Sequence, residues 1–575
     1  MRPLSLPAAA LAAGLLLTAC STPPTPTEVV TPNANLVVQG IPPIPATLAA
    51  EVAKYNDFRG HAFVDWHPLK REMLVSHRLA GASTTQLFRI SAPMAAPEQL
   101  TDTSDPVREA SYEPRTGQYI VFARATGGDE AYKLYRLDLP GRQVTLLTES
   151  NERHSLEAWT HASGRLISLS VPLDRTAEGG SRASIAQTVW LLDPLQPQNK
   201  RKLAELPGGG WAASSVSPDD RRIALTRYLS AAESQVWLLE IATGQLTQVL
   251  PAIGSTDKAT HFSGEFMRDG SGLLVTSDRG SEFREAMLYR FADRQLVPLT
   301  RHIPWDVSGG SFDAAGALLA ARANVDGREE LRLFDARTLK EVAAPAVPGG
   351  SVGAARFHPK LAELAVSLNG AKGPSEIHSL NPSSGQVERW TRSGAPAGVD
   401  VGAFAESQIV RWKSFDGRTI SGVLNLPPAR FTGRRPVLID IHGGPESQAR
   451  LGFMGRFNYF IQELGVAVIR PNVRGSEGYG KTFLSLDDGY KREDSVKDIG
   501  ALLDWVATQP GLDASRVVVS GGSYGGYMSL AVATMYPERI AGSIDTVGIS
   551  NFLSFLQNTE SYRRDLRRVE YGDER

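Results

Sequence analysis

Cysteine is nearly missing from this sequence: its 575 residues include one, Cys20. A single cysteine excludes any disulfide within the chain. An excess of basic charge is also lacking, since the formal net charge is −1, and we therefore expect no nucleic-acid partner. Beyond the N-terminus, no apolar run approaches the roughly 18 residues that a membrane-spanning helix needs.

The N-terminus, "MRPLSLPAAALAAGLLLTAC", has the pattern of a secretory signal over residues 1–20. Its ending "LTAC" resembles the bacterial lipobox, in which the cysteine is lipidated and becomes the mature N-terminus. The alternative is a plain signal peptide with a chance cysteine. Residues 21–50 contain seven prolines, which predicts an extended tether. We expect an exported lipoprotein that faces the periplasm and meets the membrane only through lipid on Cys20; Ser21 is compatible with outer-membrane sorting.

Long amphipathic helices are lacking from about residue 60 to 395, where short strands and turns repeat instead. One strand motif occurs seven times at steps of 43 to 55 residues. A second motif, a turn followed by an apolar strand, also occurs seven times. This period is typical of a β-propeller, whose small sheets must stack around an axis to bury their faces. Residues 51–400 are therefore predicted to form a propeller, with seven blades favoured over eight and over tandem β-sandwiches. The strand motifs are QLFRIS, KLYRLD, TVWLLD, QVWLLE, MLYRFA, ELRLFD and EIHSLN.

Histidines in this region are scattered over different predicted blades without the spacing of metal ligands. We interpret them as structural or surface residues and expect neither a metal site nor a cofactor. They are His61, His67, His77, His154, His161, His261, His302, His358 and His378.

The pattern changes within residues 401–575. The stretch "IVRWKSFDGRTISGVLNLP" predicts a hairpin that turns at Asp416-Gly417. After it, continuous apolar strands alternate with segments of helical periodicity, such as "EDSVKDIGALLDWVATQP". The final apolar strand is "AGSIDTVG". Alternation of this kind predicts a parallel sheet covered by helices on both faces.

A nucleophilic serine is indicated by "GGSYG", which fits G-x-S-x-G around Ser523 and lies between a predicted strand and a predicted helix. Alone, the motif is also compatible with a glycine-rich turn that has no chemistry. "HGGP" follows an earlier strand, at the position of a loop that supplies an oxyanion donor. The predicted oxyanion hole consists of the backbone N–H groups of Tyr524 and of the Gly443/Gly444 loop.

The motifs "HGGP", "NVRGSEGYG" and "GGSYGGYM", preceded by a seven-fold propeller, resemble the prolyl oligopeptidase family of serine peptidases, and most of all its acylaminoacyl-peptidase and bacterial dipeptidyl-aminopeptidase-like branch. The resemblance implies a propeller joined to an α/β-hydrolase domain, with Ser523 as nucleophile and short peptides as substrates. It also implies that Phe552 and Phe555 line the substrate pocket. Core packing is the alternative for these two phenylalanines.

A histidine is absent downstream of Ser523, although the hydrolase order is Ser, then Asp or Glu, then His. The "HGGP" loop already explains His442, and no carboxylate after Ser523 follows a recognisable further strand. The expected fold would add roughly 60 residues in two further strand–helix units. We therefore expect that the C-terminal part of the hydrolase domain, with the triad Asp and His, is missing, and that the chain as written is inactive. A natural pseudoenzyme is the alternative.

Three functions remain open at this point. The first is a peptidase that works through an acyl-enzyme on Ser523, and the second is an esterase or acyl hydrolase that uses the same site. The third is a non-catalytic propeller that acts as a binding module of the cell envelope.

Overall fold

The computed structural model describes residues 28–149, 151–174 and 185–575. Cys20 and the first part of the expected tether lie outside them. The chain divides into two compact units, residues 1–54 and 55–575. In the first, Val29 and Pro45 form an isolated bridge, and helix α1 (Ala46–Lys54) includes the last five residues of the expected tether. Among the described residues, no helix combines the length and the apolar character needed to cross a membrane.

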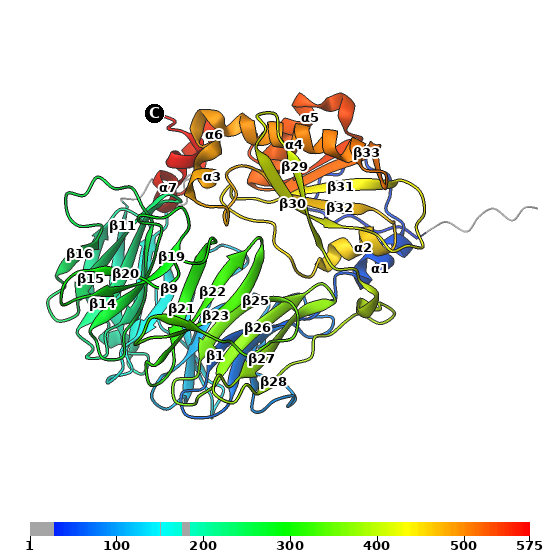
Figure 1. The fold of residues 1–575 in the computed structure, drawn as a ribbon. Coiled ribbons are helices and arrows are strands. Elements are labelled where there is room, and N and C mark those ends of the chain that lie inside the picture. The colour runs from blue at the N-terminus through cyan, green and yellow to red at the C-terminus, as the bar shows by residue number, and fades with distance from the viewer. Residues whose placement is uncertain (1–27, 150, 175–184) are drawn as a thin grey trace, which may run out of the picture. The chain divides into compact units, whose positions relative to one another are not determined.

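The predicted propeller is confirmed, with seven four-stranded antiparallel sheets that follow one another along the chain (Figure 1). The two sequence motifs have distinct places in each blade. "QLFRIS" and its six counterparts form the third strand, and the turn motif joins the first strand to the second.

The first four blades contain the following strands: β1 (His61–Trp66), β2 (Met73–His77), β3 (Gln86–Ile90) and β4 (Glu98–Gln99); β5 (Val107–Tyr112), β6 (Tyr119–Arg124), β7 (Lys133–Asp138) and β8 (Val144–Leu146); β9 (Glu152–Trp159), β10 (Leu166–Pro172), β11 (Ala186–Leu192) and β12 (Arg201–Pro207); β13 (Trp211–Val216), β14 (Arg222–Ser230), β15 (Glu233–Glu240) and β16 (Leu246–Leu250). The other three contain β17 (His261–Phe266), β18 (Gly272–Ser277), β19 (Glu285–Arg290) and β20 (Leu296–Pro298); β21 (Val307–Phe312), β22 (Leu318–Val325), β23 (Arg328–Asp335) and β24 (Lys340–Val342); β25 (Ser351–Phe357), β26 (Leu364–Gly370), β27 (Gly373–Leu380) and β28 (Val387–Arg389).

The ring closes through contacts between the first and last blades, because each blade takes its four strands from one continuous stretch of chain. Arg59 and Gly394 exchange two backbone hydrogen bonds of 2.9 and 2.8 Å. The indole Nε1 of Trp66 donates a 3.0 Å hydrogen bond to the carbonyl oxygen of Arg356. These contacts hold the two ends of the propeller together.

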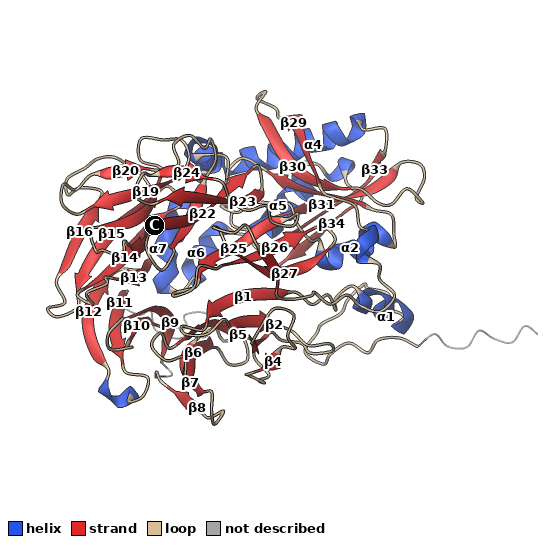
Figure 2. Cartoon of the chain, turned by 60° about the horizontal axis from the view of Figure 1, so that its bottom comes forward, coloured by secondary structure: helices blue, strands red, loops and turns tan. Residues whose placement is uncertain are grey.

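The C-terminal third forms the predicted α/β-hydrolase sheet, in the order β29-β30-β32-β31-β33-β34. The β29–β30 hairpin and the β30–β32 pair are antiparallel, and the other pairs are parallel. Figure 2 shows helices beside this sheet, whereas the propeller blades contain almost only strands and loops. The strands are β29 (Gln408–Lys413), β30 (Thr419–Asn425), β31 (Arg435–Ile441), β32 (Ala467–Asn472), β33 (Leu512–Gly522) and β34 (Gly542–Thr546). The helices are α2 (Asn458–Gln462), α3 (Lys481–Leu484), α4 (Arg492–Thr508), α5 (Tyr524–Met535), α6 (Phe552–Asn558) and α7 (Ser561–Tyr571). The short 3₁₀ turns of this region are η3 (Val401–Ala403), η4 (Gly455–Phe457), η5 (Ser485–Asp487), η6 (Gly489–Lys491) and η7 (Pro537–Arg539), and a further one, η2 (Pro197–Asn199), lies in the third propeller blade.

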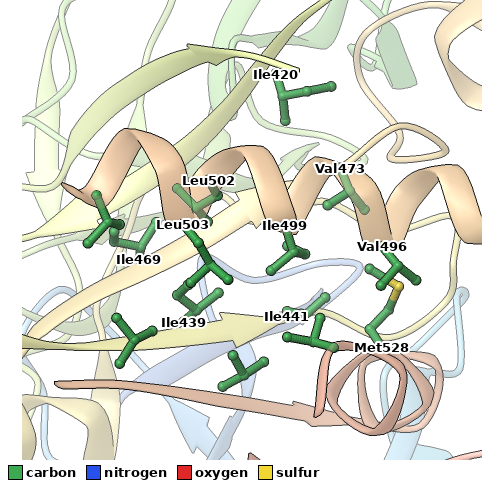
Figure 3. Close-up of a cluster of buried hydrophobic side chains, with 14 of the residues drawn as sticks. Ile420, Ile439, Ile441, Ile469, Val473, Val496, Ile499, Leu502, Leu503 and Met528 are labelled. Atoms are coloured by element: carbon green, nitrogen blue, oxygen red, sulfur yellow. The ribbon is translucent and has the colours of Figure 1, made fainter. Parts of the chain in front are cut away.

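Helix α4 covers one face of the sheet, as its periodicity predicts. Val496 and Ile499 are fully buried on its inner side. Figure 3 shows them with Leu503 next to strand residues such as Ile439 and Ile441. Burial of these aliphatic side chains fixes the strands that lead into the candidate site.

Strand β34 differs from the prediction that helices cover both faces of this sheet. It pairs with β33 alone, so it is the edge of the sheet, and Ile544 in it is 51% exposed. The apolar run "AGSIDTVG" indicates a strand correctly, but a run of this kind carries no information about whether a neighbour covers it.

Candidate active site

Ser523 lies at the turn between β33 and α5 with φ 57° and ψ −118°, a backbone conformation that non-glycine residues rarely adopt. The neighbouring glycines make this turn possible. A Cβ atom on Gly521 would collide with the Gly525 backbone, and a Cβ on Gly525 would collide with the Ile441 carbonyl. The close approach of α5 to the ends of β33 and β31 therefore requires glycine at both positions.

Gly443 follows β31 and lies directly against Ser523. A Cβ atom built on Gly443 would be 3.4 Å from the Ser523 Cβ and 3.9 Å from the Tyr524 backbone nitrogen. Tyr524 is the first residue of α5, so its N–H has no acceptor within the helix. The structure thus brings together Ser523, Tyr524 and the Gly443/Gly444 loop, in an arrangement that can place N–H donors around a developing oxyanion.

His442 is bonded away from Ser523. Its Nδ1 lies 2.8 Å from the Gly443 carbonyl oxygen, and its Nε2 lies 3.0 Å from the Ser476 Oγ. Desolvation by the surrounding protein lowers the pKa of this imidazole. These bonds give His442 a structural role in the loop, and its ring is not a base for Ser523.

A cavity of about 570 Å³ opens beside Ser523. Phe555 and Tyr571 line it, together with Gly444 and the Val547–Asn551 segment that follows β34. Phe552 is not among the lining residues. Its ring packs between Tyr527 and Tyr571, at centroid distances of 4.8 and 5.1 Å. Of the two phenylalanines considered for a substrate pocket, one thus faces the cavity and the other joins the core.

Helix α7 forms one wall of the cavity and also contacts the propeller. The Tyr571 hydroxyl donates a 2.9 Å hydrogen bond to the Gly444 carbonyl oxygen. Near the other end of the helix, Arg153 of the third blade donates a 3.0 Å bond to the Tyr562 hydroxyl, and Ser561 donates to Asp174. The helix therefore links the Gly443/Gly444 loop to the propeller.

A carboxyl group next to this loop, Glu446, was not singled out by sequence reasoning. Burial, together with the hydrogen bond and charge of Glu570, raises the pKa of Glu446 to about 8. Arg567 donates a 3.1 Å bond to Glu570. Glu446 immediately follows the "HGGP" motif, but nothing in the sequence indicates that a carboxyl group on α7 packs against it.

A second buried acid lies under the nucleophile turn. Asp487 accepts bonds from the Arg492 guanidinium at 2.6 Å and from the Tyr524 hydroxyl at 3.2 Å. Burial raises the pKa of Asp487 to about 7, although the positive charge of Arg492 opposes the shift. These bonds anchor the Tyr524 side chain, so they hold the residue that begins α5 directly after Ser523.

No histidine lines the cavity at Ser523 in the described part of the chain. The described ranges also hold no group of three or more His, Cys, Asp or Glu side chains that could bind a metal ion. The residues around this cavity therefore provide a serine at the turn before α5 and candidate oxyanion donors, but no imidazole to accept the serine proton.

Comparison with known proteins agrees with this geometry. The model of the prolyl oligopeptidase family matches residues 452–575. Dipeptidyl aminopeptidase BIII of Pseudoxanthomonas mexicana is 25% identical over 488 residues, which are 82% of this chain and 67% of that protein. Dipeptidyl peptidase family member 6 of Caenorhabditis elegans is 30% identical over 180 residues, which are 27% of this chain and 24% of that protein.

Among solved structures, a puromycin hydrolase superposes with a TM-score of 0.76 at 19% identity, over 91% of this chain and 83% of that chain. This likeness supports the fold. The family match over residues 452–575 and the dipeptidyl aminopeptidase relative, taken with the Ser523 turn, support a serine peptidase of the prolyl oligopeptidase family by ancestry.

Proposed function

We propose that Ser523 is the nucleophile of a peptidase that hydrolyses short peptides through an acyl-enzyme. The observation that carries the proposal is the backbone of Ser523, held at φ 57° on the N-terminal end of α5 and facing a cavity of about 570 Å³. A serine in this strained conformation, with Gly443 packed against it, has the geometry that nucleophilic attack on a carbonyl requires.

In the proposed reaction, the Ser523 Oγ forms a bond to the peptide carbonyl carbon while a base removes its proton. The oxyanion accepts hydrogen bonds from the Tyr524 N–H and the Gly443/Gly444 loop. The C–N bond then breaks and the amine leaves with a proton. Water attacks the resulting ester, releases the carboxylic acid and restores the serine.

The base for the first step is not provided by the described residues. His442 is the only histidine in residues 401–575, and it is bonded to Ser476 and to the Gly443 carbonyl. We therefore expect these 575 residues by themselves to hydrolyse peptides at a negligible rate.

Short peptides are the proposed substrates because the propeller contributes contacts at the wall of the cavity. Arg153 and Asp174, both from the third blade, contact helix α7. A propeller at this position would restrict entry to chains that can pass it. The names of the two relatives, a dipeptidyl aminopeptidase and a dipeptidyl peptidase family member, agree with substrates of this class.

Covalent labelling with a fluorophosphonate, followed by peptide mapping, tests the role of Ser523. We expect slow labelling at Ser523, because oxyanion donors and binding retain part of the rate when a triad member is lacking. The Ser523→Ala variant should not be labelled. Labelling that is absent, or that Ser523→Ala leaves unchanged, would favour a non-catalytic propeller. Ser523-dependent hydrolysis of acyl esters without hydrolysis of peptide amides would favour an esterase.

We also propose that Cys20 carries lipid and anchors the protein to a membrane that faces the periplasm. The support is the "LTAC" sequence at the end of the apolar N-terminal segment. Fractionation of cells that express the wild type or Cys20→Ser tests this. Equal recovery of both proteins in the membrane fraction would contradict it.

A further inference from the structure

Two arginines of helix α7 line the same cavity as Ser523. Arg563 and Arg567 are four residues apart, so they lie on one face of the helix. Their side chains are 44% and 38% exposed, which leaves both guanidinium groups accessible from the cavity. The one acidic side chain among the lining residues, Glu560, accepts a 3.2 Å hydrogen bond from the Asp174 backbone of the propeller. The lining therefore carries a net positive charge.

Each guanidinium uses only part of its hydrogen-bonding capacity. The Arg563 Nη2 donates to Glu130 of the second blade at 3.3 Å, and the Arg567 Nη1 donates to Glu570 at 3.1 Å. Within the described ranges, neither arginine makes a hydrogen bond through its other two nitrogens. A guanidinium presents five N–H donors in a planar fork that matches a carboxylate. Both arginines can thus bind a further anion without losing their present partners.

The rest of the lining suits an organic anion better than a free ion. Phe555 and Tyr571 supply apolar surface close to the arginines, and Asn551 and Asn558 supply neutral amides. Burial opposes the charge of Arg567, but the neighbouring groups, first among them Glu570, raise its pKa overall, so this cation persists at any physiological pH. A peptide that places its carbonyl at Ser523 would set its neighbouring groups among these side chains.

We propose that the Ser523 cavity recognises a carboxylate of the substrate through Arg563 and Arg567. The carboxylate is either the side chain of an acidic residue or the free C-terminus of a short peptide. The inference rests on the proposed function, since it assumes that a peptide occupies this cavity. It adds a substrate class, acidic or C-terminally free peptides.

Binding without turnover provides the test, because the 575-residue chain is expected to be inactive. The ligands are N-acetyl-Ala-Glu amide, its neutral isostere N-acetyl-Ala-Gln amide, N-acetyl-Ala-Ala with a free carboxylate, and the amide of the last. Titration calorimetry at low salt gives each Kd. The first pair of ligands reports a side-chain carboxylate, and the second pair reports a terminal one.

We expect at least one carboxylate ligand to bind about tenfold more tightly than its neutral partner, as one charge-assisted hydrogen bond would provide. Arg567→Gln and Arg563→Gln should each reduce that preference while leaving the affinity for the neutral ligand unchanged. Arg567→Lys should retain part of it, because the charge remains but the fork is lost. Arg563 is the more exposed of the two arginines, so the Arg563→Gln variant still tests the proposal if Arg567→Gln fails to fold.

Arg568→Gln is the matched control. Arg568 belongs to the same helix but bonds to Glu574 and does not line the cavity, so its loss should leave the preference intact. Equal affinity for charged and neutral ligands, or no binding of any ligand at its solubility limit, would overturn carboxylate recognition. Neither result bears on Ser523, whose role fluorophosphonate labelling tests separately.

Discussion

The Tyr571 hydroxyl donates a 2.9 Å hydrogen bond to the carbonyl oxygen of Gly444, and so ties the last residue of α7 to the candidate oxyanion loop. The two residues are 127 positions apart in the chain. The Tyr571 ring also packs against the rings of Phe552 and Phe555, at centroid distances of 5.1 and 5.3 Å. These ring contacts and the hydrogen bond together fix the position of the Tyr571 side chain. The conformation of the Gly443/Gly444 loop therefore depends on helix α7, which is not part of the "HGGP" motif.

Tyr571→Phe should lower the free energy of unfolding by about 1 kcal/mol, since it removes one partly buried hydrogen bond but keeps the ring. Urea unfolding measures the change. Tyr490→Phe is the control, because Tyr490 is fully exposed and its hydroxyl makes no hydrogen bond to a described residue. An equal, small effect of both substitutions would show that the Gly444 contact does not stabilise the loop.

The strained backbone of Ser523 predicts an unusual order of stabilities. Glycine adopts φ 57°, ψ −118° more readily than alanine does, so Ser523→Gly should be about 1 kcal/mol more stable than Ser523→Ala. Denaturant midpoints of the two variants, measured side by side, give the order. A more stable alanine variant would mean that the turn is not strained.

Gly525→Ala should destabilise the hydrolase domain by about 3 kcal/mol, because the new Cβ would overlap the carbonyl oxygen of Ile441 in a buried strand. Gly511→Ala is the matched control, since a Cβ there would meet no atom within 4 Å. Its effect should stay within about 0.5 kcal/mol. Thermal unfolding of both variants checks this, and similar losses would refute the close approach of α5 to β31.

The pair formed by Glu446 and Glu570 predicts a pH dependence. The pKa of Glu446 is raised from 4.5 to about 8, so the folded protein holds a proton that the unfolded chain releases. Its contribution to stability is therefore fully present below pH 4.5 and is lost as the pH rises to about 8.

Glu446→Gln keeps a neutral side chain at every pH and should remove this decline. The measurement is the difference in unfolding free energy between wild type and variant across that pH window. Asp487, whose pKa is raised to about 7, is present in both proteins; because the charge of Glu446 contributes to that shift, the measured difference includes this coupling. A difference that stays constant with pH would contradict the buried, protonated state of Glu446.

The sequence predicts much of this molecule because two of its signals are local. The strand repeats are recognisable because each blade contains a largely buried, apolar second strand such as β6 or β10. The closeness of Ser523 and Gly443 follows from parallel strands, whose carboxyl ends meet at one edge of the sheet. The sequence does not predict that Arg563, Arg567 and Tyr571 lie at the cavity, because the amphipathic pattern of α7 does not indicate which surface the helix packs against. Four arginines in its eleven residues were the signal that could have raised the question.

We propose that Ser523 is positioned as a nucleophile but has no base within the described residues. The most direct test is the rate at which a fluorophosphonate labels Ser523 in the 575-residue chain, with and without added imidazole. We expect slow labelling of the chain alone, a marked and saturable acceleration by imidazole, and no labelling of Ser523→Ala. Rapid labelling that imidazole does not change, or no labelling under either condition, would contradict it.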